Sequence, residues 1–346
     1  MKKLPLSYRK DLLTAIANTI NIEILYGKNI LITGVTGLIG SFLVDLLLEL
    51  NDLYNANIEI FALARNEKSA RERFEYYRLN KLHFIFQDVC EEINLPNEIN
   101  YVVHAAGDGY PEAFRIRPVE TMTPAILGTI NTLELARSKK IESYVFISSG
   151  EVYGNNSEAD SKRTEDDKYS AEGMSPRSCY PVAKQAAETL CASYVSEYNV
   201  PVKVARLSHT YGPFVSKGDN RASTQFIQKA QKAEDIVLHS KGEQIRSYTY
   251  VADAVAGILT ILLNGKDGEA YNVANPTSAV SIMEFAKELA SLADVKCQIE
   301  AANENQQKER SPISSQVLGS DKLEELGFKW AYTLQEGLRV TLDALK

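Results

Sequence analysis

Short β-branched runs alternate with longer segments of helical periodicity between residues 29 and 206. Six runs bounded by polar or turn residues are predicted strands, at residues 29–33, 58–64, 83–86, 101–104, 144–148 and 202–206. Apolar residues recur at helical spacing at residues 38–51, 68–79, 118–138 and 180–197. This alternation is typical of βαβ units, so we predict an α/β fold with a doubly wound parallel sheet.

The rhythm changes after Arg206, where Gly-Pro, Gly-Asp and Gly-Glu pairs separate shorter elements. We therefore expect an N-terminal extension over residues 1–28, a sheet domain over 29–206 and a smaller C-terminal lobe over 207–346. Whether the last part returns to the sheet domain is left open. Within the extension, residues 6–24 predict a short helix and a further strand.

Composition narrows the classes of protein that fit. The chain has 346 residues, of which 45% are hydrophobic and 24% charged, enough apolar side chain for a full core. A net charge of -7 argues against broad binding to nucleic acid or anionic membrane, so an anionic ligand must be held locally. Four cysteines without paired spacing, no signal-peptide pattern and no membrane-spanning run favour a cytoplasmic protein.

A glycine-rich turn follows the first predicted strand and opens a helix, which is the context of a dinucleotide-binding fingerprint. Gly34 permits a tight turn, Gly37 lets a pyrophosphate approach the backbone, and Gly40 allows close packing of helix on sheet. The residues assigned to the cofactor here are Gly34, Thr36, Gly37, Leu38, Ile39 and Gly40. We therefore expect NAD or NADP on a Rossmann-type sheet.

Two later positions bear on which cofactor binds. Where an acidic residue would hold the ribose, the second strand ends in Arg65, which favours NADP unless it is a solvated surface residue. Asp88 and Val89, after the third strand, are assigned to the adenine edge, although a loop-capping aspartate is the alternative.

Tyr180 and Lys184 stand four residues apart in a helical segment and therefore project from one face. A neighbouring ammonium would lower the phenol pKa, so Tyr180 could accept a proton from a substrate hydroxyl as hydride leaves. Ser149 follows the fifth predicted strand, at the carboxyl end where open α/β sheets bind ligands, and could hydrogen-bond the reacting oxygen.

The fingerprint, the strand-end serine and the Tyr/Lys pair, in this order, resemble the extended short-chain dehydrogenase/reductase family. The segments RSCY with Lys184, AETLC, and GDNR with Phe226 are most similar to UDP-glucuronate decarboxylases. This resemblance implies a nucleotide-diphosphate sugar as substrate, a homodimer, and no metal. It assigns Ala105 to the cofactor. The residues assigned to the substrate are Asp108, Tyr110, His209, Arg221, Arg246 and Arg310, with surface arginines and a core histidine as alternatives.

The family chemistry runs through a 4-keto sugar, and three outcomes stay open: decarboxylation, 4,6-dehydration and 4-epimerisation. The resemblance assigns Glu151 to catalysis with Ser149, Tyr180 and Lys184, because decarboxylases and dehydratases carry a glutamate at this position. Gly150 stands where many dehydratases carry an acid. Asp108 departs from the decarboxylase pattern and would repel a substrate carboxylate. Decarboxylation is the first expectation. A dinucleotide-binding sensor or scaffold without turnover is the alternative from another class, which the set of Ser149, Tyr180 and Lys184 argues against.

Overall fold

The computed structural model describes residues 4–77, 80–96, 98–154, 162–215, 218–301 and 313–346. Within these residues the main sheet has seven parallel strands in the order β10-β6-β5-β4-β1-β2-β3. Its strands are β1 (Asn29–Thr33), β2 (Glu59–Ala64), β3 (Leu82–Phe86), β4 (Tyr101–His104), β5 (Ser143–Ser149), β6 (Val202–Leu207) and β10 (Ala270–Val273). The doubly wound α/β fold is confirmed, and the six predicted strands each agree within one residue at either end.

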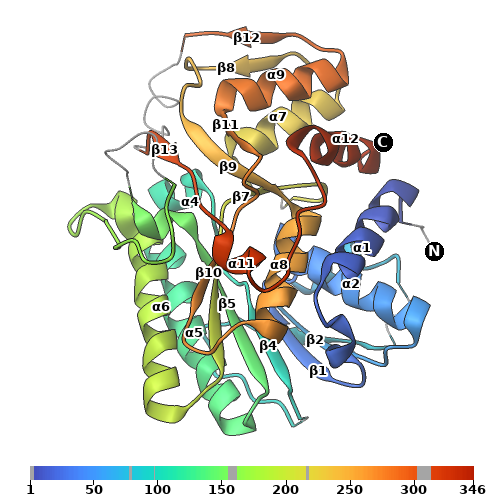
Figure 1. Ribbon diagram of the computed structural model, residues 1–346, viewed down its shortest axis with the longest axis vertical. Coiled ribbons are helices and arrows are strands. Elements are labelled where there is room, and N and C mark those ends of the chain that lie inside the picture. Colours follow the sequence, from blue (N-terminus) through green and yellow to red (C-terminus); the bar gives the residue numbers. More distant parts are fainter. Residues whose placement is uncertain (1–3, 78–79, 97, 155–161, 216–217, 302–312) are drawn as a thin grey trace.

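Burial on both faces of the sheet explains why its strands are almost continuously apolar. In β1, Ile30 and Ile32 pack into one core cluster, whereas Leu31 between them packs into the other. The first face is covered by α2 (Leu38–Tyr54) and α8 (Val251–Asn264), and the second by α5 (Pro118–Lys139) and α6 (Cys179–Tyr198) (Figure 1). The chain beyond Leu207 therefore contributes α8 and β10 to the layers of the large sheet.

A smaller lobe lies above the carboxyl ends of these strands (Figure 1). Its strands are β7 (His209–Tyr211), β8 (Ile236–Leu238), β9 (Ile245–Tyr250), β11 (Ala279–Ser281), β12 (Cys297–Ile299) and β13 (Ser315–Gln316). Its helices are α7 (Ala222–Gln231), α9 (Ile282–Ala293) and α12 (Leu334–Ala344). The short helices α4 (Pro111–Ile116) and α11 (Asp321–Glu324) connect elements near the junction. This arrangement leaves space for a ligand between sheet and lobe.

The N-terminal segment contains α1 (Leu6–Asn18), as predicted, but the expected strand after it is wrong. Residues Ile22–Leu25 form a 3-10 helix that begins after Asn21, whose φ of 59° lies in the left-handed region. Ile22 and Leu25 are both buried, and a spacing of three places them on one side of a helical turn. An extended strand would have turned them to opposite faces.

A buried ion pair fastens α1 and α2 to α3 (Glu67–Arg73). Arg73 pairs with Asp45 of α2, and the Tyr8 hydroxyl of α1 donates to the same carboxylate at 2.5 Å. The helix predicted over residues 68–79 ends at Arg73, because Arg73 turns inward to Asp45 and Phe74 is fully buried. Charges in this position stabilise the fold only as a complete set.

We expect Asp45→Asn to lower the free energy of unfolding by about 3–5 kcal/mol, because the Arg73 guanidinium would stay buried without its anion. Urea denaturation measures this change. The control is Glu67→Gln, which breaks an exposed pair with Arg71 and should change stability by about 0.5 kcal/mol or less. Equal effects of the two substitutions would contradict the assignment.

Candidate active site

A cavity of about 620 Å³ lies between the carboxyl ends of the large sheet and the smaller lobe. Every predicted site residue within the described part of the chain lines it. Arg310 lies outside the described residues. The cavity is thus lined by the glycine turn after β1, by Arg65 after β2, by Ser149 of β5 and by Tyr180 of α6.

The glycine turn between β1 and α2 is packed too tightly for side chains at two positions. A Cβ on Gly34, whose φ is 72°, would lie 2.6 Å from the carbonyl oxygen of Ala105. A Cβ on Gly40 would lie 2.4 Å from the carbonyl oxygen of Gly34. α2 begins after Gly37 with no side-chain cap, so its N-terminal dipole faces the cavity. These features fit the pyrophosphate of a dinucleotide.

Arg65 and Asp88 lie at the end of the cavity nearest β2 and β3. Arg65 is exposed and free to meet a ligand from solvent. Partial burial raises the pKa of Asp88, whereas the hydrogen bond from the backbone N–H of Cys90, at 2.9 Å, and the charge of Arg65 lower it. The lowering effects are larger, so the pKa of Asp88 lies below its ordinary value. A carboxylate and a guanidinium are therefore both present where an adenosine ribose would be recognised.

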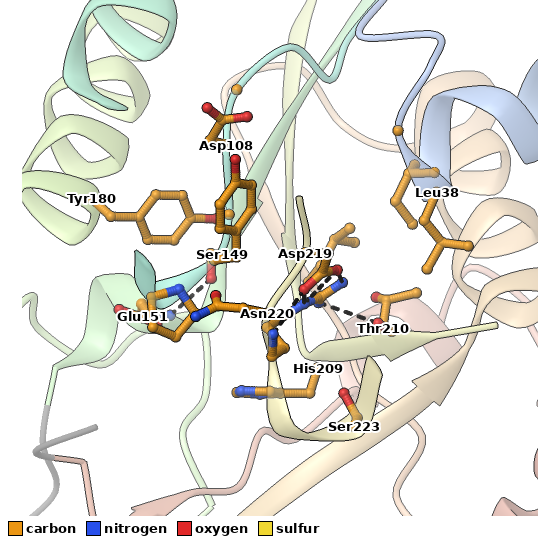
Figure 2. A pocket seen from close by; sticks show the side chains of 18 of the residues that line it. Leu38, Asp108, Ser149, Glu151, Tyr180, His209, Thr210, Asp219, Asn220 and Ser223 are labelled. Atoms are coloured by element: carbon orange, nitrogen blue, oxygen red, sulfur yellow. Dashed lines mark hydrogen bonds and ion pairs between the residues drawn. The ribbon is translucent and has the colours of Figure 1, made fainter. Parts of the chain in front are cut away.

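Tyr180 is held between an aromatic ring and the serine. Its ring stacks on Phe114 with centroids 4.6 Å apart, and Figure 2 shows its hydroxyl pointing toward Ser149. Burial, followed by the charge of Glu151, raises the pKa of Tyr180 to about 12, although hydrogen bonding with Ser149 and the charge of Arg221 act in the opposite direction. The phenol alone is thus less acidic than the sequence suggested.

Lys184 lies beside the Tyr180 ring but is hydrogen-bonded to the backbone of β5. Its ammonium donates to the carbonyl oxygen of Ile147 at 2.7 Å and lies 5.9 Å from the centroid of the Tyr180 ring. Burial lowers the pKa of Lys184 to about 8, although the charge of Glu188 favours the ammonium. The lysine lines the cavity but points first at the backbone of β5.

Glu151 and Arg177 form an ion pair on the cavity wall, with Nη1 and Oε2 3.4 Å apart. The Arg177 guanidinium lies over the ring of Phe114, 5.1 Å from its centroid. The backbone N–H of Glu151 donates to the Ser149 hydroxyl at 3.2 Å (Figure 2). The 3-10 turn Gly150–Tyr153 therefore fixes serine, glutamate and arginine relative to one another.

The lobe contributes two arginines with different partners, the half-buried Arg221 and the buried Arg246. Arg221 forms an ion pair with Asp219 (Figure 2). Arg246 is 3% exposed and has no carboxylate partner within the described ranges. Burial and the charges of these two arginines hold the pKa of His209 well below its usual value, so the imidazole is neutral. Arg246 leaves net positive charge beside the cavity, as an anionic ligand requires.

Asp108 and Tyr110 enter the cavity from the loop between β4 and α4. Arg117 donates to the Tyr110 hydroxyl at 3.1 Å and to the Asp108 carboxylate at 3.5 Å. Figure 2 shows Asp108 on the same side of the cavity as Tyr180. The charge that the sequence predicted beside the substrate is present but has a counter-ion.

The cavity also contains Gln316, which sequence reasoning missed. No motif marks this residue, because it belongs to the two-residue strand β13. Within the described ranges, no cluster of three or more His, Cys, Asp or Glu side chains could hold a metal ion. Nor is any described helix both long and apolar enough to cross a bilayer.

Comparisons with known proteins agree with this geometry. Residues 30–274 match the model of the NAD dependent epimerase/dehydratase family. The chain belongs to that family. It is 31% identical over 316 residues to UDP-glucuronic acid decarboxylase 6 of Arabidopsis thaliana, covering 89% of this chain and 86% of that protein.

Two solved structures share the fold. An epimerase of Methanothermobacter thermautotrophicus superposes with a TM-score of 0.78 at 20% identity, covering 98% of this chain and 95% of that one. UDP-glucuronic acid 4-epimerase of Bacillus cereus, solved with UDP-glucuronic acid and NAD, has a TM-score of 0.75 at 22% identity, covering 92% and 98%. The family resemblance predicted from the sequence is confirmed, and the chain is an enzyme of this nucleotide-sugar-modifying family.

The low pKa of Lys184 predicts a pH-dependent contribution to stability. Between pH 8 and 10.5 the unfolded chain retains a proton that folded Lys184 has lost, so this residue makes stability rise with pH, by up to about 1.4 kcal/mol per unit. Urea denaturation of Lys184→Met should lack that component. Exposed Lys287→Met is the control and should follow the wild type; parallel curves for all three proteins would contradict the pKa shift.

Proposed function

We propose that this enzyme removes the carboxylate of a nucleotide-linked uronic acid, with UDP-glucuronate as the first substrate to test. The observation that carries the proposal is the meeting of Ser149, Tyr180 and the Glu151–Arg177 pair in one cavity beside the glycine turn. The 31% identity to a UDP-glucuronic acid decarboxylase supports the same reading. A nicotinamide cofactor, when bound, supplies reversible hydride acceptance.

The glycine turn and the start of α2 would hold the pyrophosphate of the nicotinamide cofactor. Arg65 and Asp88 would lie at its adenosine end, and Tyr180 and Lys184 at its nicotinamide end. In the first step Tyr180 takes the proton of the sugar C4 hydroxyl, and Ser149 hydrogen-bonds the same oxygen. A phenol with a pKa of about 12 needs help to act near neutral pH. That help comes from positive charge: the Lys184 ammonium below its pKa and the charge of the oxidised cofactor.

Loss of this proton, together with the C4 hydride that a bound nicotinamide would accept, leaves a ketone β to the C6 carboxylate, which makes loss of carbon dioxide feasible. The bond between C5 and C6 breaks, its electron pair moves into the ring as an enolate, and Ser149 and Tyr180 stabilise the developing charge on the C4 oxygen. A proton from water then adds at C5. Tyr180 then returns its proton to the C4 oxygen, and the reduced cofactor would supply the hydride that restores C4.

A second candidate function starts from a neutral hexose and ends in 4,6-dehydration or 4-epimerisation. It is favoured by Asp108, whose carboxylate lines the cavity and would repel a uronate. Arg117 offsets this charge only in part, because its guanidinium is shared with Tyr110 and Glu120. Product analysis with UDP-glucuronate and UDP-glucose separates the two candidates.

The proposal includes a homodimer formed through α5 and α6, as the family resemblance implies. Val119 and Leu127 of α5 are 71% and 44% exposed, which supports an apolar contact on that helix. In the proposed dimer, a second copy of this chain packs against this face of α5.

We expect Tyr180→Phe to reduce product formation from UDP-glucuronate by about 10²–10⁴-fold, because the proton acceptor is lost. NMR of the sugar product and capture of carbon dioxide measure this. Tyr194→Phe is the control, since that hydroxyl bonds Glu134 away from the cavity, and it should retain activity. Unchanged turnover in Tyr180→Phe would refute the catalytic role, and turnover of UDP-glucose alone would favour the second candidate.

We further propose that Arg65 makes NADP the preferred cofactor. Loss of a charge-assisted contact to the 2′-phosphate in Arg65→Ala should weaken NADP binding about 10–100-fold and leave NAD binding unchanged. Fluorescence titration with both dinucleotides tests this. Arg71→Ala is the control, because Arg71 pairs with Glu67 outside the cavity. A wild type that binds NAD more tightly than NADP would reject the preference.

A further inference from the structure

The side-chain amide of Gln316 faces the cavity from the smaller lobe. Gln316 is 5% exposed, lines the cavity, and lies beside Arg246 in the pairing of β13 with β9. Its Nε2 atom has no hydrogen-bond partner within the described part of the chain. Because a buried N–H group without an acceptor destabilises a fold, an acceptor that arrives with a ligand would account for its placement.

Gly150 locates this amide within the cavity. A Cβ on Gly150 would lie 3.4 Å from Nε2 of Gln316 and 2.8 Å from a methyl carbon of Leu318. Gly150 stands between Ser149 and Glu151, at the end of β5 that carries the reacting groups. The unpartnered donor is therefore on the same side of the cavity as the reacting part of the substrate.

Arg246 holds β13, the strand that carries Gln316, in place before any ligand binds. Its guanidinium donates to the carbonyl oxygens of Ile313 at 2.6 Å and Ile245 at 2.7 Å. The backbone N–H of Leu318 donates to the Ser247 hydroxyl at 3.2 Å. These bonds hold both sides of Gln316 against β9, so its amide is preorganised and loses little conformational entropy on binding.

We propose that Gln316 is a sugar-binding residue that donates its Nε2 hydrogen to an oxygen of the sugar in the bound nucleotide sugar. The inference rests on the proposed function, which places the sugar beside Ser149 and Tyr180. A neutral amide suits a hydroxyl or carboxyl oxygen of a sugar, whereas the buried guanidinium of Arg246 supplies the charge that phosphate oxygens require. Gln316 therefore contributes to recognition of the sugar rather than of the nucleotide.

The test compares ligands with and without the sugar. Calorimetry should show that Gln316→Leu weakens binding of UDP-glucuronate about tenfold and leaves UDP binding unchanged. Gln335→Leu is the control, because its amide bonds Glu288 on the surface. If affinity falls for UDP-glucuronate but not for UDP-glucose, the acceptor is a carboxyl oxygen. If affinity falls equally for both sugar nucleotides, the acceptor is a hydroxyl. Both outcomes support the proposal.

Three outcomes would overturn it: no change in sugar-nucleotide affinity, equal weakening of UDP, or a wild type that binds UDP-sugars no better than UDP. Since Nε2 has no partner among the described residues, Gln316→Leu should not lower the melting temperature. If the leucine variant does not fold, Gln316→Asn replaces it. This substitution shortens the side chain by one methylene and moves the amide donor away from the ligand, so it should weaken sugar-nucleotide binding in the same way. Binding without carbon dioxide release would reject the decarboxylase proposal and leave the result for Gln316 intact.

Discussion

The site depends on the removal of a phenol and an ammonium group from water. Lys184 is buried and Tyr180 is half-buried, and burial shifts each pKa toward the neutral form, to about 12 for Tyr180 and about 8 for Lys184. The two shifts move the proton affinities of the phenol and the amine apart, because their ordinary pKa values of 10.0 and 10.5 are nearly equal. Formation of the phenolate therefore requires positive charge at the cavity, where interactions between partly buried charges are screened less than in water.

Most of the other charged side chains in the cavity have a counter-ion. Glu151 is offset by Arg177, Asp219 by Arg221, and Asp108 in part by Arg117. Arg246 differs, since its described hydrogen bonds go to backbone carbonyls and none goes to a carboxylate. The net positive charge is therefore concentrated at the lobe, where it can attract an anion although the whole chain is acidic.

Local sequence predicted the large sheet well because its strands are short, apolar and separated by helices of clear periodicity. The glycine turn was predictable for a related reason: the approach of Gly34 to Ala105 and of Gly40 to Gly34 leaves no room for a side chain. Prediction was poorer where tertiary contacts decide. The segment Ile22–Leu25 reads as a strand, but the core it packs against selects a helical turn, and α3 ends early because Arg73 is drawn to Asp45.

The sequence by itself determined the order of the strands from β1 to β6, the glycine turn after β1 and the identity of most polar groups that line the cavity, since each of these follows from spacing within one short segment. Tertiary structure alone decided the protonation behaviour of Tyr180 and Lys184 and the convergence of Asp108 with Arg117. It also placed Gln316 beside Gly150, although 166 residues separate them along the chain. The physical reason is that burial, charge and hydrogen bonding depend on neighbours that folding brings together from distant parts of the chain.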